Sequence, residues 1–288
     1  MTVFLQSVLS GLLVGGVYAL IGIGLTIIFG VMRVINFAHG DLLMLGMYAT
    51  WFIFTKTGLD PYVALIATAP LLFLWGAFLQ KVFINRVLNA LPQNQILLTI
   101  GLGLIMSNSM MLIFTSDYRI LTTSYSSSSF DLGGLSVSQP LLYSFAITAA
   151  ITAALFWFLS RTDTGQAIRA TAQDRDAAQL MGINVKWTSI LAFGIGSALS
   201  GAAGTLIAPT YYIYPQVGSA FTLKAFVIVV LGGMGSIVGA TLGGLIIGMT
   251  ESLAAIYVAS GLKELVVFVL FLALLLFRPS GLLGKSRA

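Results

Sequence analysis

RTDTGQAIRATAQDRDAAQLMGINVKW, residues 161–187, is a strongly polar internal stretch in a chain dominated by apolar residues. On both sides of it run hydrophobic segments that approach or exceed the length needed to cross a bilayer, about 20 residues. So many charges in one internal loop mark a part of the chain that meets water. The segment therefore fixes one aqueous side of a membrane protein. Its charged side chains are Arg161, Asp163, Arg169, Asp174, Arg175, Asp176 and Lys186.

The composition excludes a soluble globule. Of 288 residues, 58% are hydrophobic and only 8% are charged, and the mean hydropathy is +1.00, whereas soluble domains carry about 25% charged residues. A transmembrane β-barrel would show short alternating segments, and these apolar runs are continuous. The chain has no cysteine, which removes disulfides and thiol chemistry. The net charge of +5 is that of a membrane protein with basic cytoplasmic loops, not of a nucleic-acid-binding protein.

The sequence therefore predicts an all-α, polytopic transmembrane bundle of about eight spans in one domain, residues 1–288. The first residues lack a positive stretch, so we interpret them as the approach to a first helix and not as a cleaved signal. The expected spans cover about residues 3–29, 36–54, 62–80, 92–114, 140–160, 188–209 and 262–277, with a broken segment over 221–259.

Basic residues predict the orientation, because positive loops stay in the cytoplasm. They put the N-terminus outside and the C-terminus in the cytoplasm. The serine-rich loop 116–139 is then periplasmic, and the loop with Tyr211, Tyr212 and Tyr214 is expected at the outer interface. The basic markers of the inner side are Arg33, Lys81, Arg86, the loop 161–187, and the tail with Arg278, Lys285 and Arg287.

Two hydrophobic segments are interrupted by glycine, Asn36–Thr50 and Leu231–Gly244. The piece before Gly232 is too short to cross at 1.5 Å per residue, so we expect a half-helix that enters from outside, turns at the glycines within the protein and returns. Paired broken segments indicate a transporter's translocation region and are compatible with an internal repeat. The alternative is that the glycines only let helices pack closely.

Few polar side chains lie inside the apolar segments. His39 and Asp41 are two residues apart and do not share a helix face, which argues against a proton relay or a metal site. The alternative is that both lie near the cytoplasmic end of a helix. Glu251 is an intramembrane acid, or a side chain near the outer boundary that bonds to a neighbouring helix. The candidate translocation residues are Asn36, His39, Asp41, Gly232, Gly233, Gly235 and Glu251, whereas Lys224, Lys263 and Glu264 are expected to snorkel at the interface.

Motifs of soluble catalysis are absent from the sequence. It contains no GxxxxGK[ST] phosphate loop, no HExxH and no GxSxG. We therefore expect no catalytic residues, no metal and no cofactor in this chain. The energy for any transport must come from an ion gradient or from a partner.

The charged loop predicts a short helix over residues 165–181, capped by Asp163 or Thr164 and ended by Gly182. Such an amphipathic helix could lie on lipid or fit a groove of a protein partner. Its opposite charges nearly cancel, which disfavours an anionic lipid surface and favours a protein.

The run GLLVGGVYALIGIGLTIIFGVMRVINFAHGDLLMLGMY resembles the opening of inner-membrane permease subunits of branched-chain amino acid ABC importers, the first-permease type. DRDAAQLMGIN, LSGAAGTL and LGGMGSIVGATLGG are similar to the same family, so the likeness runs along essentially the whole chain. One departure is Asp176, which stands where the broader importer class has glutamate.

The resemblance implies a permease for branched-chain or other hydrophobic amino acids, working with a second homologous permease, two cytoplasmic ATPases that bind ATP and Mg²⁺, and a periplasmic binding protein. The alternatives are the same importer type carrying urea, an amide or an aromatic acid, and a stand-alone ion-coupled transporter or channel. A membrane-embedded enzyme lacks a catalytic cluster. By the same resemblance, the ATPase-coupling residues are Asp174, Arg175, Asp176, Ala177, Ala178, Leu180, Met181 and Gly182.

Overall fold

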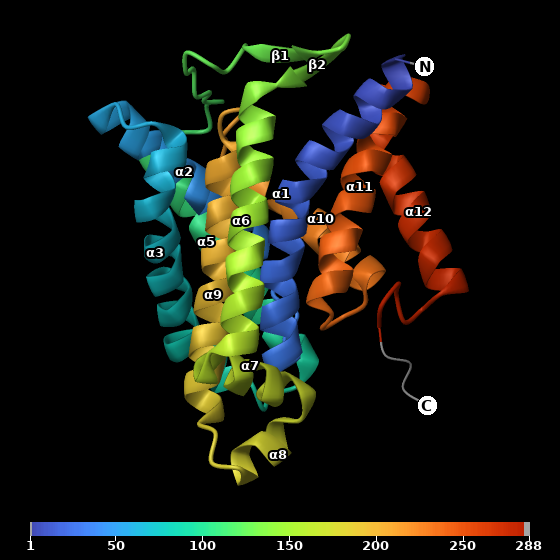
Figure 1. Ribbon diagram of the computed structural model, residues 1–288. Helices are drawn as coiled ribbons and strands as arrows, with labels where there is room; N and C mark the ends of the chain where they lie inside the picture. The colour runs from blue at the N-terminus through green and yellow to red at the C-terminus, as the bar shows by residue number, and fades with distance from the viewer. Residues whose placement is uncertain (1, 285–288) are drawn as a thin grey trace.

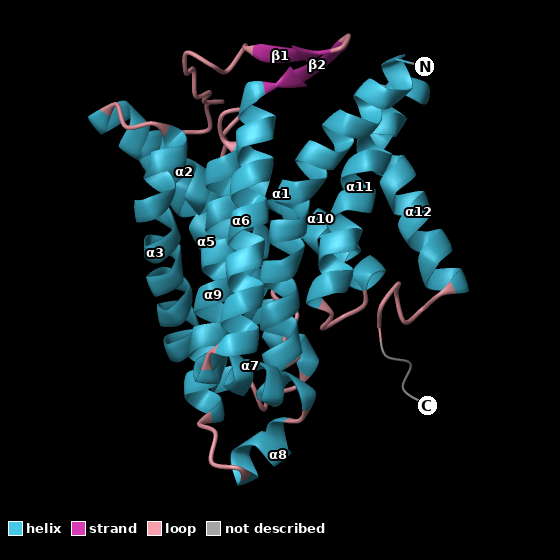
Figure 2. Cartoon of the chain, in the orientation of Figure 1, coloured by secondary structure: helices cyan, strands magenta, loops and turns pink. Residues whose placement is uncertain are grey.

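The computed structural model describes residues 2–284 and shows a bundle of helices that run between two ends (Figures 1 and 2). Among the described residues, seven helical segments are long and apolar enough to cross a membrane. This confirms the prediction of an all-α polytopic bundle. The seven segments are α1 (Thr2–Met32), α3 with its continuation (Pro61–Val87), α5 (Pro92–Phe114), α6 (Gln139–Arg161), α9 (Val185–Ile207), α11 (Ile237–Tyr257), and η2 with α12 (Ser260–Phe277).

Two further apolar helices are shorter or begin inside the bundle: α2 (His39–Thr57) and α10 (Val217–Gly232). Helix α3 proper covers Pro61–Leu79 and continues through the π-helical turn η1 (Gln80–Ile84) into α4 (Asn85–Val87). On the C-terminal side, η2 covers Ser260–Leu262 and α12 covers Lys263–Phe277.

Prolines and glycines set several of these helix boundaries where the sequence predicts them. Pro61, Pro92 and Pro140 each stand in the first turn of a helix, where the missing N–H costs nothing. Gly58 ends α2 in the left-handed conformation with φ of 70°.

The loop 116–139 contains a β-hairpin, which the sequence pattern did not predict. Strand β1 (Ser129–Leu132) pairs antiparallel with β2 (Leu135–Ser138). The hairpin lies at the same end of the bundle as the N-terminus (Figure 1). The Gln6 side chain fixes it to α1, because its Oε1 accepts a hydrogen bond from the backbone N–H of Ser136 at 2.9 Å.

Small residues bring α1 and α11 into backbone contact. A Cβ at Gly11 would lie 2.7 Å from the Met249 Cα, and one at Gly15 would lie 2.9 Å from the Leu245 Cα. Real Cβ atoms do not approach that closely, so the two helices pack as they do only because these positions lack side chains. Gly11 and Gly15, four residues apart, therefore form a packing face of α1.

The helix contacts show an inverted repeat. The first unit is α1, the segment 33–38, α2, α3 and α5; the second is α9, the segment 208–216, α10, α11 and α12. Helix α1 packs on α11 while α9 packs on α3, and α2 contacts α10. Helices α1 and α9 run in opposite directions (Figure 1). The expected internal repeat is therefore present in the pattern of packing.

In the first unit, the chain re-enters the bundle after α1 ends. Residues 33–38 carry no regular structure, and α2 then begins at His39. The His39 Nε2 atom lies 3.0 Å from the carbonyl oxygen of Ile21. Ile21 is eleven residues before the end of α1, which is about 16 Å along the helix. The placement of His39 near the cytoplasmic end of a helix is therefore wrong, because α2 begins in the middle of the bundle.

In the second unit, the re-entrant segment is the one with the tyrosines. The Tyr211 hydroxyl lies 3.1 Å from the Tyr18 hydroxyl, halfway along α1, and Ile213 is fully buried. Tyr212 is 59% exposed and Ile213 pairs with Arg119 of the loop 116–139, so the segment reaches from that loop to α1, and its interfacial placement stays a prediction. Pro209 and Pro215 flank this segment and oppose a continuous helix.

The break at Gly232–Ser236 is the turn between α10 and α11, and it does not lie at mid-depth as expected. The Cα of Gly235 would lie 3.9 Å from a Cβ at Gly30, two residues before the end of α1. The backbone N–H groups of Leu282 and Leu283 bond to the carbonyls of Leu231 and Gly232. The turn therefore lies at the end of the bundle to which α1 and α12 descend. Lys285 and Arg287 of the basic tail lie outside the described residues.

Candidate translocation path and coupling surface

Two half-helices begin side by side inside the bundle. The backbone N–H of Gly40 donates to the Thr222 Oγ1 at 2.9 Å, and that hydroxyl lies 3.2 Å from the carbonyl oxygen of Phe37. A Cβ at Gly40 would collide with the Gly218 carbonyl. One threonine thus connects the first turns of α2 and α10, and a glycine permits their contact.

The first candidate path residues lie at this junction. Asn36 and His39 are fully buried. The Asn36 Oδ1 accepts a hydrogen bond from the Ala38 N–H at 3.2 Å, and the Ser200 hydroxyl donates to the His39 carbonyl at 2.8 Å. Within residues 2–284, the Asn36 Nδ2 and the His39 Nδ1 have no hydrogen-bond partner. His39 faces α1, whereas Asp41 faces α5 and α10. This agrees with the spacing argument that the two do not share a face.

Asp41 lies between two glycines. A Cβ at Gly218 would lie 2.7 Å from Asp41 Oδ1, and a Cβ at Gly103 would lie 2.5 Å from Oδ2. The side chain is half-buried. Its carboxylate therefore occupies the space that side chains of α5 and α10 would otherwise fill.

Glu251 is paired with two lysines. The Lys224 Nζ lies 2.9 Å from both of its carboxylate oxygens, and the Lys263 Nζ lies 3.0 Å from Oε1. The side chains of Glu251 and Lys224 are only 7% and 12% exposed, and that of Lys263 is 33% exposed. The snorkelling interpretation of Lys224 is wrong, because the carboxylate holds it inside the bundle. The alternative that a neighbouring helix satisfies Glu251 is confirmed.

Two tyrosines extend this network to α1 and to the second re-entrant segment. The Lys224 Nζ donates to the Tyr18 hydroxyl at 3.1 Å and lies 4.9 Å from the centroid of its ring. The Tyr18 hydroxyl in turn contacts that of Tyr211. Tyr18 and Lys224 belong to this network although the sequence pattern did not predict their roles in it. A buried acid needs a cation, and Lys224 lies within the apolar helix that precedes α11, which is the signal that could have identified it.

The glycine turn lies apart from the junction. Gly233 and Gly235 have φ of 100° and 89°, so the turn itself requires glycine at both positions. A Cβ at Gly233 would lie 2.7 Å from the Gly284 Cα. Gly232 packs against Gly239 across the turn. The structure therefore brings Asn36, His39 and Asp41 together and leaves Gly232, Gly233, Gly235 and Glu251 elsewhere.

The charged loop forms two helices, not the single one predicted. Helix α7 covers Asp163–Gln173 and α8 covers Arg175–Leu180. They separate at Asp174, whose φ and ψ of −148° and 113° are extended. Its Oδ1 accepts hydrogen bonds from the N–H groups of Asp176 and Ala177, both at 3.0 Å, which caps α8.

The observed helix boundaries in the charged loop differ from the predicted ones at the start of the loop and agree with them at its end. Thr162 is the N-cap of α7, because its hydroxyl accepts from the Gly165 N–H at 3.0 Å, and not Asp163 or Thr164 as expected. Gly182 has φ of 85° and follows α8 as predicted.

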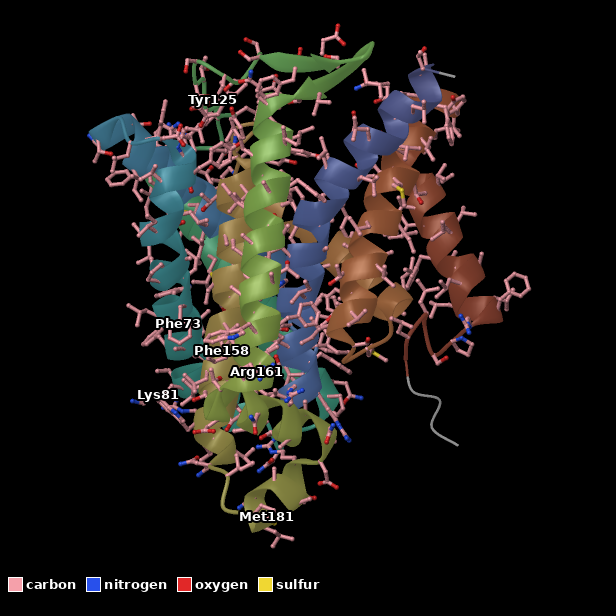
Figure 3. The ribbon with its side chains drawn as sticks, in the orientation of Figure 1. Phe73, Lys81, Tyr125, Phe158, Arg161 and Met181 are labelled. Carbon is pink, nitrogen blue, oxygen red and sulfur yellow. The ribbon has the colours of Figure 1, made fainter. Side chains whose placement is uncertain are left out.

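Helix α8 projects from the end of the bundle opposite the N-terminus (Figure 1). At its tip, Leu180 and Met181 are 88% and 83% exposed, and Met181 is the lowest labelled residue in Figure 3. Ala178 is buried, and the other expected coupling residues lie around the same short helix. Exposed apolar side chains among charges on a projecting element are typical of a protein-binding surface.

Helix α7 connects α8 to the bundle. Its buried face contains Gly165, Ile168 and Thr171. A Cβ at Gly30, near the end of α1, would lie 3.7 Å from that of Ala172, and α7 also contacts α6 and α9. A force on α8 would therefore reach the ends of three long helices.

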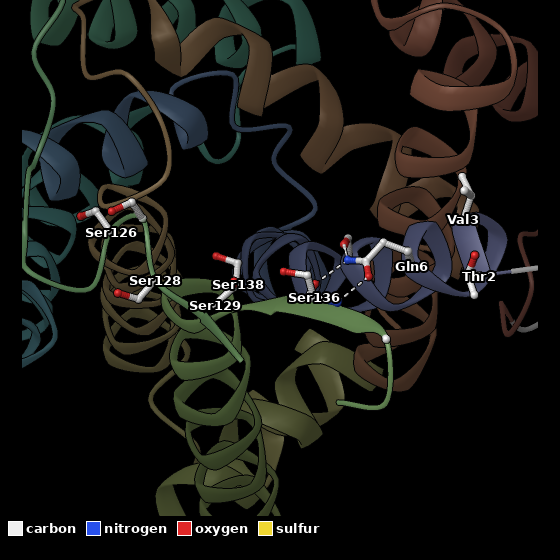
Figure 4. A pocket seen from close by; sticks show the side chains of 11 residues that line it. Thr2, Val3, Gln6, Ser126, Ser128, Ser129, Ser136 and Ser138 are labelled. Atoms are coloured by element: carbon white, nitrogen blue, oxygen red, sulfur yellow. Dashed lines mark hydrogen bonds between the residues drawn. The ribbon is translucent and has the colours of Figure 1, made fainter. Parts of the chain in front are cut away.

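A polar hollow lies at the opposite end of the molecule. It has a volume of about 530 Å³ and is bounded by the start of α1 and the loop 116–139 (Figure 4). Its lining is dominated by serines: Ser10, Ser126, Ser127, Ser128, Ser129, Ser136 and Ser138.

A bundle with seven membrane-capable helices, two half-helices that meet inside it and a projecting helix pair at one end defines a membrane permease. The chain belongs to the branched-chain amino acid transport permease family, since residues 7–275 match the family described as branched-chain amino acid transport system / permease component.

Curated relatives match over nearly their whole length. The chain is 35% identical to the high-affinity branched-chain amino acid transport system permease protein BraD of Pseudomonas aeruginosa, over 98% of this chain and 96% of BraD. It is 33% identical to the corresponding LivH of Escherichia coli K12, over 98% and 96%. A probable branched-chain amino acid transport permease protein LivH of Methanocaldococcus jannaschii is 27% identical, over 97% and 92%. No solved structure gives a significant match.

Proposed function

We propose that this chain is the permease subunit of an ATP-binding-cassette importer that carries branched-chain or other hydrophobic amino acids across the inner membrane. The observation that carries the proposal is α8, which presents Leu180 and Met181 to water at the end of a helical membrane bundle. The sequence has no nucleotide-binding motif of its own. A partner that hydrolyses ATP and binds this surface would supply the energy.

The α8 end is proposed to be cytoplasmic. Lys81 and Arg161 lie toward that end in Figure 3, and positive residues stay on the cytoplasmic side. The N-terminus and the serine-lined hollow would then face the periplasm, where a substrate-binding protein would dock on polar side chains. The chain would end in the cytoplasm.

The full importer is proposed to contain a second homologous permease, two ATPases that bind ATP and Mg²⁺, and the periplasmic binding protein. No nucleic acid takes part. Asp41 lies on a side of the bundle where it is only half-buried in the isolated chain. A carboxylate facing lipid is costly, so this side would face the second permease and, with it, enclose a watery path.

The contacts between helices support a mechanism by which movement of the ATPases would reach the translocation path. Closure of the ATPases would displace α8, and α7 would pass the movement to the end of α1 through Gly30 and Ala172. Helix α1 carries Ile21, whose carbonyl contacts the His39 ring, and Tyr18, whose hydroxyl contacts Lys224. Both half-helices are therefore bonded to the helix that α7 touches. Tilting α1 would shift the junction between outward and inward access.

The candidate path narrows to the junction with Asn36, His39 and Asp41. Gly232, Gly233 and Gly235 would act at its cytoplasmic end as the hairpin turn of α10 and α11. Glu251 would act by holding Lys224, and so α10, in place.

The test is uptake into proteoliposomes that contain both permeases and both ATPases. Radiolabelled leucine should enter only with ATP inside and binding protein outside, and unlabelled valine or isoleucine should compete. If urea, an amide or an aromatic acid competed and valine did not, that compound class would be assigned as the substrate in place of hydrophobic amino acids. Uptake by this chain without ATPases would support a stand-alone transporter and contradict the proposal.

A further inference from the structure

Asp41 is a carboxylate without a cation at the middle of the bundle. Within residues 2–284 the ion pairs join Lys224 and Lys263 to Glu251, and Asp41 accepts no hydrogen bond from any described residue. This differs from Glu251, which is fully paired. An intramembrane carboxylate with no partner marks a functional site.

The first turns of the two half-helices face this carboxylate without forming hydrogen bonds to its oxygens. Asp41 lies in the first turn of α2, and it contacts Gly218 in the first turn of α10. Each helix start carries a partial positive charge that favours an anion. A carboxylate that merely capped these helices would accept hydrogen bonds from their free N–H groups. Asp41 does not, so its acceptors remain free for another donor.

Further side chains of α5 and of the start of α10 carry polar atoms or sulfur near Asp41. Ser107 follows Gly103 by one turn on α5, and Met111 one turn later lies 3.8 Å (Sδ to Nε2) from Gln216. Ser219, next to Gly218 on α10, is exposed and bonds only to its own helix.

We propose that Asp41 binds the primary ammonium group of the transported solute at the junction of the half-helices. This inference rests on the proposed function and narrows its substrate class to amino acids, because urea, amides and aromatic acids lack a cationic amine. An ammonium offers three N–H donors and a charge that matches the carboxylate. Because Gly103 and Gly218 have no side chains, there is space for the Asp41 carboxylate between α5 and α10.

Thiol labelling tests the site independently of transport. The chain has no cysteine, so Ser219→Cys introduces one thiol beside the Gly218–Asp41 contact. In the assembled importer, the primary ammonium reagent aminoethyl methanethiosulfonate and the anionic reagent sulfonatoethyl methanethiosulfonate are compared by mass analysis of this chain. After correction for their rates with a free thiol, we expect the cationic reagent to react at least about tenfold faster.

The control is made in the same background. Asp41→Asn should bring the two rates to within about twofold, whereas Asp131→Asn, in the outer hairpin, should leave the ratio unchanged. Leucine should slow the cationic reagent, and 4-methylpentanoate, which has the leucine side chain but no ammonium, should not. A ratio that is insensitive to Asp41→Asn, or equal protection by both compounds, would overturn the inference.

Uptake provides the second readout. Asp41→Asn should lower leucine uptake at least tenfold in an importer that still assembles, while Asp131→Asn retains uptake. Normal leucine uptake by the Asp41→Asn importer would overturn the ammonium site and leave the proposed function standing. Failure of the unmodified importer to take up any amino acid would instead contradict the proposed function.

Discussion

The Glu251 network allows a quantitative prediction about stability. Glu251→Gln leaves Lys224 and Lys263 without a counter-charge, and Lys224 is only 12% exposed. Removing one partner of a buried ion pair costs about 3–5 kcal/mol. For chains of comparable size each kcal/mol shifts the melting temperature by about 2–4 °C, so a loss of roughly 6–20 °C is expected. Thermal unfolding of the purified protein in mild detergent measures it.

Substitution of either lysine should destabilise the protein less than Glu251→Gln does. Lys263→Met should cost less than about 1 kcal/mol, because that side chain is 33% exposed and water screens its interaction. Lys224→Met should cost more than Lys263→Met and less than Glu251→Gln, because Glu251 still has Lys263 as a counter-charge. The double variant Lys224→Met with Glu251→Gln should lie within about 1 kcal/mol of the unmodified protein, because no buried charge is left unpaired. Equal effects of Glu251→Gln and Lys263→Met, or simple additivity in the double variant, would refute the reasoning.

Three further predictions concern packing, the junction and the coupling helix. Gly11→Ala should destabilise the protein by about 1–3 kcal/mol in thermal unfolding because the new Cβ meets the Met249 backbone, while Gly101→Ala, with no atom within 4 Å, should not. Thr222→Val leaves the Gly40 N–H without its acceptor and should cost about 1–3 kcal/mol and lower leucine uptake, with Thr222→Ser retaining both. Asp174→Ala removes the α8 cap, worth about 1 kcal/mol, and should weaken ATPase co-purification, whereas Asp174→Asn should preserve it; equal binding by both variants would contradict the role of the cap.

The helix boundaries were predictable because they depend on local chemistry. Pro92 and Pro140 stand in the first turn of a helix, and Gly182 follows the end of one, for reasons of backbone geometry that hold in any context. The spans were predictable because a bilayer requires long apolar helices. The division of the charged loop was not, because Asp174 is compatible with the middle of a helix until its side chain is seen to cap α8.

The depth of each break could not be read from the sequence. Glycines at 232–235 suggested a turn inside the protein, but positive φ values at Gly233 and Gly235 are equally suited to a hairpin at the end of the bundle. The true counterpart of the segment 33–38 is the tyrosine-containing segment 208–216, which looks interfacial by composition. Only the contact between Tyr211 and Tyr18 reveals its depth.

The candidate site was predictable in part for a related reason. Asn36, His39 and Asp41 are rare polar residues in an apolar segment, which predicts a functional role, and they lie at one junction. Glu251 meets the same criterion, yet its partners Lys224 and Lys263 depend on how α10, α11 and α12 pack. Long-range pairing of this kind follows from the fold and not from sequence spacing.

Coupling through α8 is the central claim, and one measurement tests it directly. ATP hydrolysis and leucine uptake are measured together in the reconstituted importer for Leu180→Ser with Met181→Ser, and for the control Gln173→Ser at the end of α7. The account predicts that the double variant inserts normally but loses ATP-driven uptake, while the control is unaffected. Normal uptake with Leu180 and Met181 replaced would contradict it.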